Sequence, residues 1–139
     1  MSAIDSLIRL HRYKLDEKRL HLAELDRLAE RLRNEGVRLE QELVHEQRAA
    51  AASAEARYAY GNFAKDLNAR RAKLKSSVTE VEGQIVAARE ALAEAFQEVK
   101  RYEITAENRR KHGRLVAARR HQIEQDEVAA QLFRRREPR

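Results

Sequence analysis

Apolar residues recur along the first half of the chain at alternating intervals of four and three positions. The series consists of Ile4, Ile8, His11, Leu15, Lys18, Leu22, Leu25, Ala29, Leu32, Gly36, Leu39 and Leu43. An average interval of about 3.5 residues is the heptad pattern of helices that wind around each other with a left-handed twist. His11, Lys18 and Gly36 are poor residues for such a seam. The pattern predicts a first long helix over residues 4–51.

A second heptad series occupies the other half of the chain. Its members are Leu74, Val78, Val81, Ile85, Ala88, Leu92, Ala95, Val99, Tyr102 and Ala106. The same spacing then reaches Arg109, Gly113, Val116, Arg120 and Ile123, so the apolar seam weakens beyond residue 106. We expect a second helix that extends to about residue 136 and ends in a basic tail.

The large seam residues are absent between residues 48 and 62, so the chain is expected to turn within residues 50–62. Ser53 could cap a new helix that has Glu55 in its first turn. Alternatively, Gly61 and Asn62 form the turn themselves. Either choice predicts an all-α fold, a long antiparallel two-helix coiled-coil hairpin with the longer helix at the C-terminus. We expect one coiled-coil domain over residues 1–139.

The composition supports helices with a narrow seam rather than a thick core. Charged residues make up 37% of the chain, aromatic residues 5%, and there is one Pro. This composition is typical of a coiled coil. Without Cys, the chain has no disulfide, thiolate zinc site or cysteine nucleophile. No apolar run is long enough to cross a membrane, and Asp5 and Arg9 interrupt the start where a signal peptide would be apolar. We therefore expect a cytoplasmic protein without a membrane span.

The net charge of +6 is concentrated near the C-terminus, because residues 101–139 carry 11 basic and 6 acidic side chains, a net charge of +5. The basic clusters are Arg109-Arg110-Lys111, Arg119-Arg120 and Arg134-Arg135-Arg136. Acidic residues lie among them, and aromatic residues do not alternate with them as single-stranded nucleic acid would require. We expect an acidic protein partner and no nucleic acid.

Motifs for catalysis, cofactor binding or metal binding are missing from the sequence. There is no Walker loop, glycine-rich fingerprint, HExxH or GxSxG motif. No two of the five histidines are three or four positions apart, the spacing that places two ligands on one helix face. The acidic residues neighbour Lys and Arg at helical spacing, as on a solvated helix face. The sequence predicts no enzyme, no cofactor and no metal site.

An aromatic cluster lies close to the expected turn. Tyr60, Phe63 and Leu67 follow each other in steps of three and four, which places them on one helix face. They either pack the tip of the hairpin or form an exposed patch for a partner.

The order of three segments resembles the FliJ family of bacterial flagellar type III export proteins. These segments are LIRLHRYKLDEKRLHLAEL, RYAYGNFAKDL and YEITAENRRKHGRLVAARRHQIEQDEVA. The resemblance implies a non-enzymatic stalk whose terminal end enters the pore of the export ATPase hexamer, similar to the central stalk of rotary ATPases. It implies contacts with the regulator of that ATPase and with the export gate protein FlhA, and some members bind export chaperones. It places the protein in the cytoplasm, peripheral at the inner face of the cell membrane at the flagellar base.

The resemblance assigns a gate-binding role to one set of residues and favours a turn near Ser53, and the role of a second, basic set is our own electrostatic hypothesis. Tyr60, Phe63 and Leu67 match the spacing of the family's gate-binding face, whereas Arg70 departs from its apolar character. The ATPase ring would be met by basic residues at the end where both termini meet: Arg9, Arg12, Lys14, Arg119, Arg120, Arg134 and Arg135. The chain is then expected to be a monomer. The alternatives are a stalk protein of virulence-type injectisomes and a generic homodimeric coiled-coil scaffold.

Overall fold

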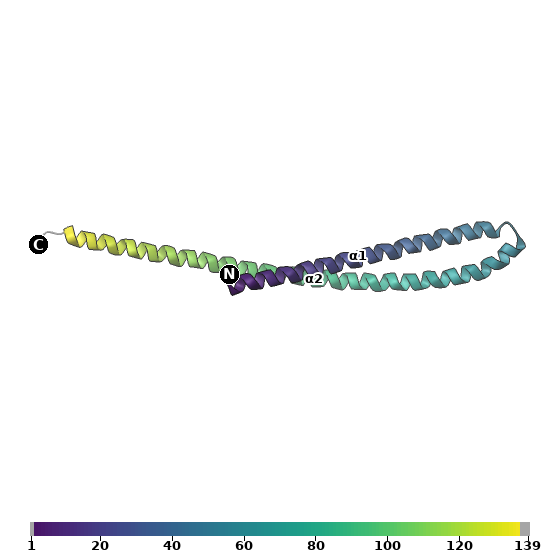
Figure 1. Cartoon of the computed structure of the whole chain (residues 1–139), viewed down its shortest axis with the longest axis horizontal. Helices are drawn as coiled ribbons and strands as arrows, with labels where there is room; N and C mark the ends of the chain where they lie inside the picture. Colours follow the sequence, from purple (N-terminus) through teal and green to yellow (C-terminus); the bar gives the residue numbers. More distant parts are fainter. Residues whose placement is uncertain (1, 137–139) are drawn as a thin grey trace. The chain divides into compact units, whose positions relative to one another are not determined.

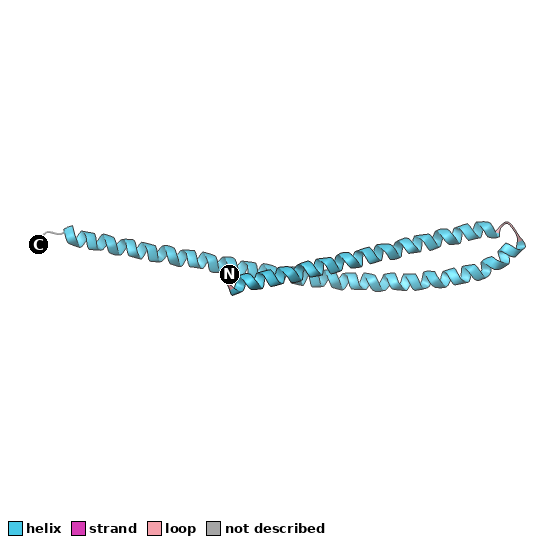
Figure 2. Ribbon diagram, in the orientation of Figure 1, coloured by secondary structure: helices cyan, strands magenta, loops and turns pink. Residues whose placement is uncertain are grey.

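The computed structural model describes residues 2–136 of the chain and contains two helices, α1 (Ala3–Ala50) and α2 (Ala54–Arg136) (Figure 1). α2 is the longer helix, with 83 residues against 48 in α1. Helix accounts for 97% of the structure, and no strand occurs among residues 2–136 (Figure 2). The prediction of an all-α hairpin with a longer C-terminal helix is confirmed.

α1 begins at a pair of side chains that cap each other. The Ser2 hydroxyl donates a hydrogen bond of 2.8 Å to Asp5 Oδ2, and the Asp5 backbone N–H donates one of 3.3 Å to Ser2 Oγ. This reciprocal arrangement satisfies backbone donors that have no partner inside the helix. The hydrogen bond from Ser2 also lowers the pKa of the Asp5 carboxyl, because it stabilises the charged form.

The turn between the helices lies at residues 51–53. The backbone N–H groups of Ala51 and Ala52 donate to the carbonyls of Arg48 and Ala49, at 3.3 and 3.1 Å, and so close the last turn of α1. Ser53 then caps α2, because its hydroxyl oxygen accepts a hydrogen bond of 3.0 Å from the Ala56 N–H. Gly61 and Asn62, the other candidate for the turn, lie inside α2. The chain therefore reverses at a serine cap and not at a glycine.

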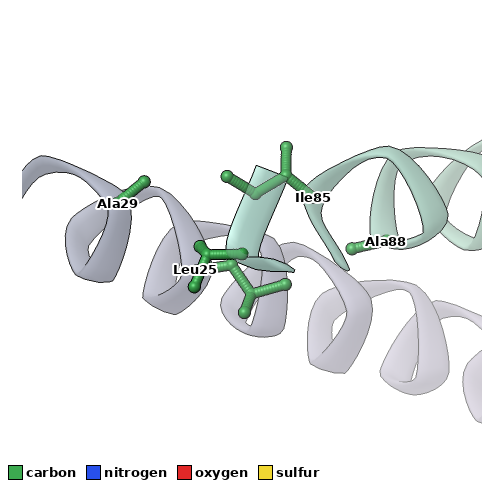
Figure 3. Packing of buried hydrophobic residues seen from close by; sticks show 5 residues of the cluster. Leu25, Ala29, Ile85 and Ala88 are labelled. Carbon is green, nitrogen blue, oxygen red and sulfur yellow. The ribbon is translucent and has the colours of Figure 1, made fainter. Parts of the chain in front are cut away.

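The chain divides into two compact units, which we describe separately. The hairpin unit is Tyr13–Phe96 and contains the turn. Its core consists of Leu25 and Ala29 of α1 together with Val81, Ile85 and Ala88 of α2, and Leu22, Leu28 and Leu32 pack against it (Figure 3). Alanine at two of the five core positions allows the helices to approach closely, but it buries little apolar area per residue. The core of this unit is thus a thin seam between two helices.

Burial follows the predicted heptads. Of the twelve seam positions in α1, only Lys18 is exposed, and the others are buried or half-buried. In α2 every predicted position from Leu74 to Ala106 is at least half-buried, whereas the weak continuation at Arg109, Gly113, Val116, Arg120 and Ile123 is exposed. Two of these five positions carry arginine and one carries glycine, which matches the loss of the apolar pattern.

The terminal unit is Met1–Arg12 with Gln97–Arg139. Ile8, Val99 and Ala106 are buried in it. The ring of His11 stacks on that of Tyr102, with 4.6 Å between the ring centroids and 22° between the planes, and Arg12 donates a hydrogen bond of 3.2 Å to Glu103. All residues from 108 to 136 are exposed. We call residues 108–136 of α2 the distal helix.

Candidate functional site

The aromatic cluster at the start of α2 combines one buried residue with two half-buried ones. Leu67 is 2% exposed, and it is the largest side chain that is fully buried among the described residues. Tyr60 and Leu67 continue the seam of α2 backwards from Leu74 at intervals of seven, whereas Phe63 lies one position to the side. Leu67 therefore belongs to the contact between the helices, and only Tyr60 and Phe63 keep part of their surface for a partner.

Tyr58 is a residue near the turn that the sequence reasoning missed. Its side chain is 83% exposed, more than any other large apolar residue among those described. It stands two positions before Tyr60 and outside the heptad positions of α2. The sequence feature that could have identified Tyr58 is an aromatic residue at a position outside the heptad seam. Arg70, which departs from the family pattern, is held 3.3 Å from Asp66 on the same helix.

The predicted basic residues do not form one cluster. Arg9, Arg12, Arg119, Arg120, Arg134 and Arg135 belong to the terminal unit, and Lys14 belongs to the hairpin unit. All seven side chains are exposed. Within the terminal unit, Arg9 and Arg12 lie on α1, where they line a groove together with Glu103 and Glu107. At about 1.5 Å per residue, Arg134 lies roughly 20 Å further along α2 than Arg120.

Ion pairs distinguish the cations of the terminal unit from each other. Glu103 accepts contacts from Arg12 at 3.2 Å and from Lys100 at 3.5 Å, and Glu107 accepts contacts from Arg110 and Arg114 at 3.2 and 3.5 Å. The hydrogen bond from Arg12 lowers the pKa of Glu103, since it stabilises the carboxylate. Within the described part of the chain, the arginines beyond Arg114 form no ion pair: Arg119, Arg120, Arg134, Arg135 and Arg136. No described carboxylate holds these five guanidinium groups, in contrast to those of Arg12, Arg110 and Arg114.

Residues 2–136 contain no group of three or more His, Asp or Glu side chains that could hold a metal ion. A search of the same residues finds no helix with the length and hydropathy needed to span a membrane. The carboxyl groups of Asp5 and Glu103 have a lowered pKa, and both stabilise the start of α1 or its contact with α2. The geometry of the described residues thus offers surfaces for partners, in the form of helix faces and shallow grooves.

Comparison with known protein families matches residues 1–138 of the chain to the family described as Flagellar FliJ protein. No curated protein and no solved structure matches the chain. The family match covers nearly the whole chain and confirms the resemblance that the three sequence segments indicated. The family is known as one of non-catalytic flagellar proteins. The chain therefore belongs to the FliJ family and is a flagellar export-related protein.

Proposed function

We propose that the chain is the stalk of the flagellar export ATPase, a non-enzymatic part that inserts its distal helix into the pore of the ATPase hexamer. The observation that carries this proposal is the distal helix itself, because residues 108–136 continue α2 with every side chain exposed. A helix that is exposed around its whole circumference gains little from packing within its own chain, and it is suited to a partner that surrounds it. Membership of the FliJ family supports the same role.

The dimensions of the distal helix suit a pore. At about 1.5 Å per residue it is roughly 43 Å long, and a helix with its side chains is about 10–12 Å wide. The guanidinium groups of Arg119, Arg120, Arg134 and Arg135, which pair with no described carboxylate, would then face carboxylates or backbone carbonyls of the ring. Arg9, Arg12 and Lys14 are proposed as further contacts near the entrance, although Arg12 already donates to Glu103. The stalk performs no chemistry and transmits the state of the ring to a second assembly.

That second assembly is proposed to be the export gate protein FlhA. Tyr60 and Phe63, which keep part of their surface exposed, make the contact, and the buried Leu67 holds them in place from beneath. The chain then works as a single coiled-coil domain in the cytoplasm, at the inner face of the membrane, with the ATPase regulator and export chaperones as further partners. An exposed aromatic edge on a supported helix is a common form of protein contact.

The role of the distal arginines is tested by replacing Arg134, Arg135 and Arg136 with alanine together. We expect weaker association with the purified export ATPase ring, and a smaller decrease of that association as salt is raised, because charge pairs are screened by ions. The measurement is a titration by fluorescence anisotropy at several salt concentrations. A matched control replaces Arg27, Arg31 and Arg89, exposed arginines of the hairpin unit that form no ion pair in the described structure. If both triple variants bind the ATPase ring as tightly as the native chain does, this assignment is wrong.

A homodimeric scaffold is a second candidate, because the distal helix also exposes apolar side chains. The largest of these are Leu115, Ile123, Val128, Leu132 and Phe133. Two copies that paired through this helix would bury part of that surface. Light scattering separates the candidates, because a stalk is expected at the monomer mass of 16.2 kDa and a scaffold at twice that mass.

A further inference from the structure

A groove runs between α1 and α2 in the hairpin unit, on the side of the seam where Val37 and Val44 project. It consists of two adjoining hollows that share Val37, Glu40 and Arg71; Leu74 and Val78 of α2 and the bare backbone of Gly36 line the first, and Val44 lines the second. We call this surface the valine groove. A Cβ placed on Gly36 would lie 3.5 Å from Leu74 Cδ2, an ordinary packing distance, so the glycine leaves the floor of the groove open there. Nothing proposed for the ATPase ring or the gate uses this surface.

The apolar part of the groove has the spacing of a helix face. Val37 and Val44 are 54% and 43% exposed. They are seven residues apart on α1, which is two helical turns or about 10.5 Å. A partner helix with apolar residues at intervals of three, four and seven positions has an apolar stripe along one face. The side chains of that stripe recur every two turns, which is the same distance as that between the two valines. The two valines are therefore spaced to pack against one face of a third helix.

The rim of the groove is positively charged. Arg33, Arg48, Arg71 and Lys75 line it, and Glu40 is its one carboxylate. Glu40 is already held by Arg71 at 2.9 Å, and Arg33 contacts Glu82, which does not line the groove, at 3.2 Å. Lys75 and Arg48 form no ion pair with any described residue. The groove thus presents an apolar floor between four cations, of which Arg48 and Lys75 have no described carboxylate partner.

We propose that the valine groove binds an acidic amphipathic helix of a partner protein. The apolar stripe of that helix covers Val37 and Val44, and its flanking carboxylates pair with Arg48 and Lys75. A second copy of this chain is the poorer occupant, because the same cations would face each other across the contact. Single-stranded nucleic acid is also poorer, because no Phe, Tyr or Trp lines the groove to stack on its bases.

The valine groove is separate from the proposed gate contact. Phe63, Arg70 and Ser77 follow each other at intervals of seven on α2, so they lie along one side of that helix. Arg70 and Ser77 line a different groove, which they share with Glu35 and Lys73. Phe63 therefore belongs to the opposite flank of the hairpin, and one flank can be altered without the other. The proposal stands or fails independently of the stalk function.

The test uses the full chain and two fluorescein-labelled synthetic peptides. The first peptide is a helix of repeating heptads with Leu at the seam positions and Glu on both sides of them. The second has the same composition in an order that destroys the stripe. Fluorescence anisotropy should show that the striped peptide binds at least about tenfold more tightly than the permuted one, as burial of a valine-sized group implies. Absence of binding, or equal binding of the two peptides, would overturn the proposal.

Variants locate the binding surface. Val37→Ser with Val44→Ser should weaken binding of the striped peptide by about tenfold or more. Val86→Ser is the matched control, because Val86 is 55% exposed and lies outside the groove. Lys75→Glu should also weaken binding, and Lys65→Glu, an exposed lysine of α2 outside the groove, should not. Thermal unfolding followed by circular dichroism verifies that each variant is folded. If the valine variant and Lys75→Glu both bind like the native chain, the site lies elsewhere and the proposal is wrong.

The same variants address the other occupants. Self-association in sedimentation equilibrium that disappears with Val37→Ser and Val44→Ser would identify the groove as a contact between copies of this chain. Tighter binding of a single-stranded oligonucleotide than of the striped peptide, lost in Lys75→Glu, would identify it as a nucleic-acid surface. Either result overturns the acidic helix as the occupant.

Discussion

Leu67 separates packing from partner binding at the start of α2. The sequence places Tyr60, Phe63 and Leu67 on one face, but the steps of three and four leave open whether that face points inward or outward. The structure buries Leu67 and leaves its two companions half-exposed. Phe63 falls beside the heptad seam and Leu67 falls on it, whereas Tyr60 also falls on the seam but lies seven residues nearer the turn and is only half-buried. The shared face alone therefore does not decide which of the three residues is buried.

This difference predicts that two alanine substitutions affect different properties, stability in one case and partner binding in the other. Leu67→Ala should lower the free energy of unfolding by roughly 2–5 kcal/mol, because it leaves a cavity between the helices. Phe63→Ala should weaken binding to the gate protein by on the order of tenfold, while the helix content stays near that of the native chain. Chemical denaturation followed by circular dichroism measures the first effect, and titration with the purified gate protein measures the second. A large loss of helix content in Phe63→Ala would instead show that Phe63 packs the tip.

Glu103 is a residue whose charge stabilises the terminal unit. Its pKa lies below the ordinary glutamate value of about 4.3, because Arg12 donates a hydrogen bond to the carboxylate. The folded chain therefore binds this proton less readily than the unfolded chain does. The resulting stability is fully present above the ordinary pKa, and it is lost as the pH falls through the lowered value.

Glu103→Gln should thus lower the melting temperature at about pH 7, and the difference from the native chain should shrink towards about pH 3. The difference in melting temperature is measured by thermal unfolding, followed by circular dichroism, at a series of pH values. Glu90→Gln is the control, because Glu90 is exposed and forms no ion pair in the described structure. A difference between the native chain and Glu103→Gln that does not change with pH would contradict the role of this ion pair.

At the scale of the elements, the heptads contained most of what was needed to predict the fold. Apolar positions at intervals of four and three identified both seams, and burial follows them as far as Ala106. The residues alone did not choose the position of the turn, because alanine favours helix and both Ser53 and Gly61 were chemically suitable, whereas the family resemblance favoured Ser53. In the structure the turn precedes α2, which is capped by Ser53. The ion pairs could not be predicted from the sequence either. The pattern of charges does not show that Arg12 pairs with Glu103 while Arg119 pairs with no described residue.

The distal helix is expected to open more readily than the hairpin unit, because its backbone hydrogen bonds are not covered by a facing helix. Hydrogen exchange followed by mass spectrometry should find faster exchange over residues 108–136 than around Leu25 and Ile85. Addition of the export ATPase should slow exchange over residues 108–136 if a ring encloses that segment. Equal protection of both segments in the free chain would show that the distal helix is stabilised by some contact that the exposure of its side chains does not indicate.

At the scale of the whole molecule, we propose that one chain serves as the stalk of one ATPase ring. The family match establishes the flagellar system, and the exposed, unpaired arginines of the distal helix support the stalk. A stalk on the axis of a ring differs from a protein that binds each subunit, because a ring has one axis and several subunits. Stoichiometry therefore distinguishes the stalk from other modes of binding to the same ATPase.

The most direct measurement is native mass spectrometry of the purified chain mixed with the purified export ATPase. We predict a complex of one chain per ATPase hexamer, with more hexamer formed than in the absence of the chain. The variant in which Arg134, Arg135 and Arg136 are alanine should form less of this complex. A ratio of one chain per ATPase subunit, or the absence of any complex, would contradict the stalk.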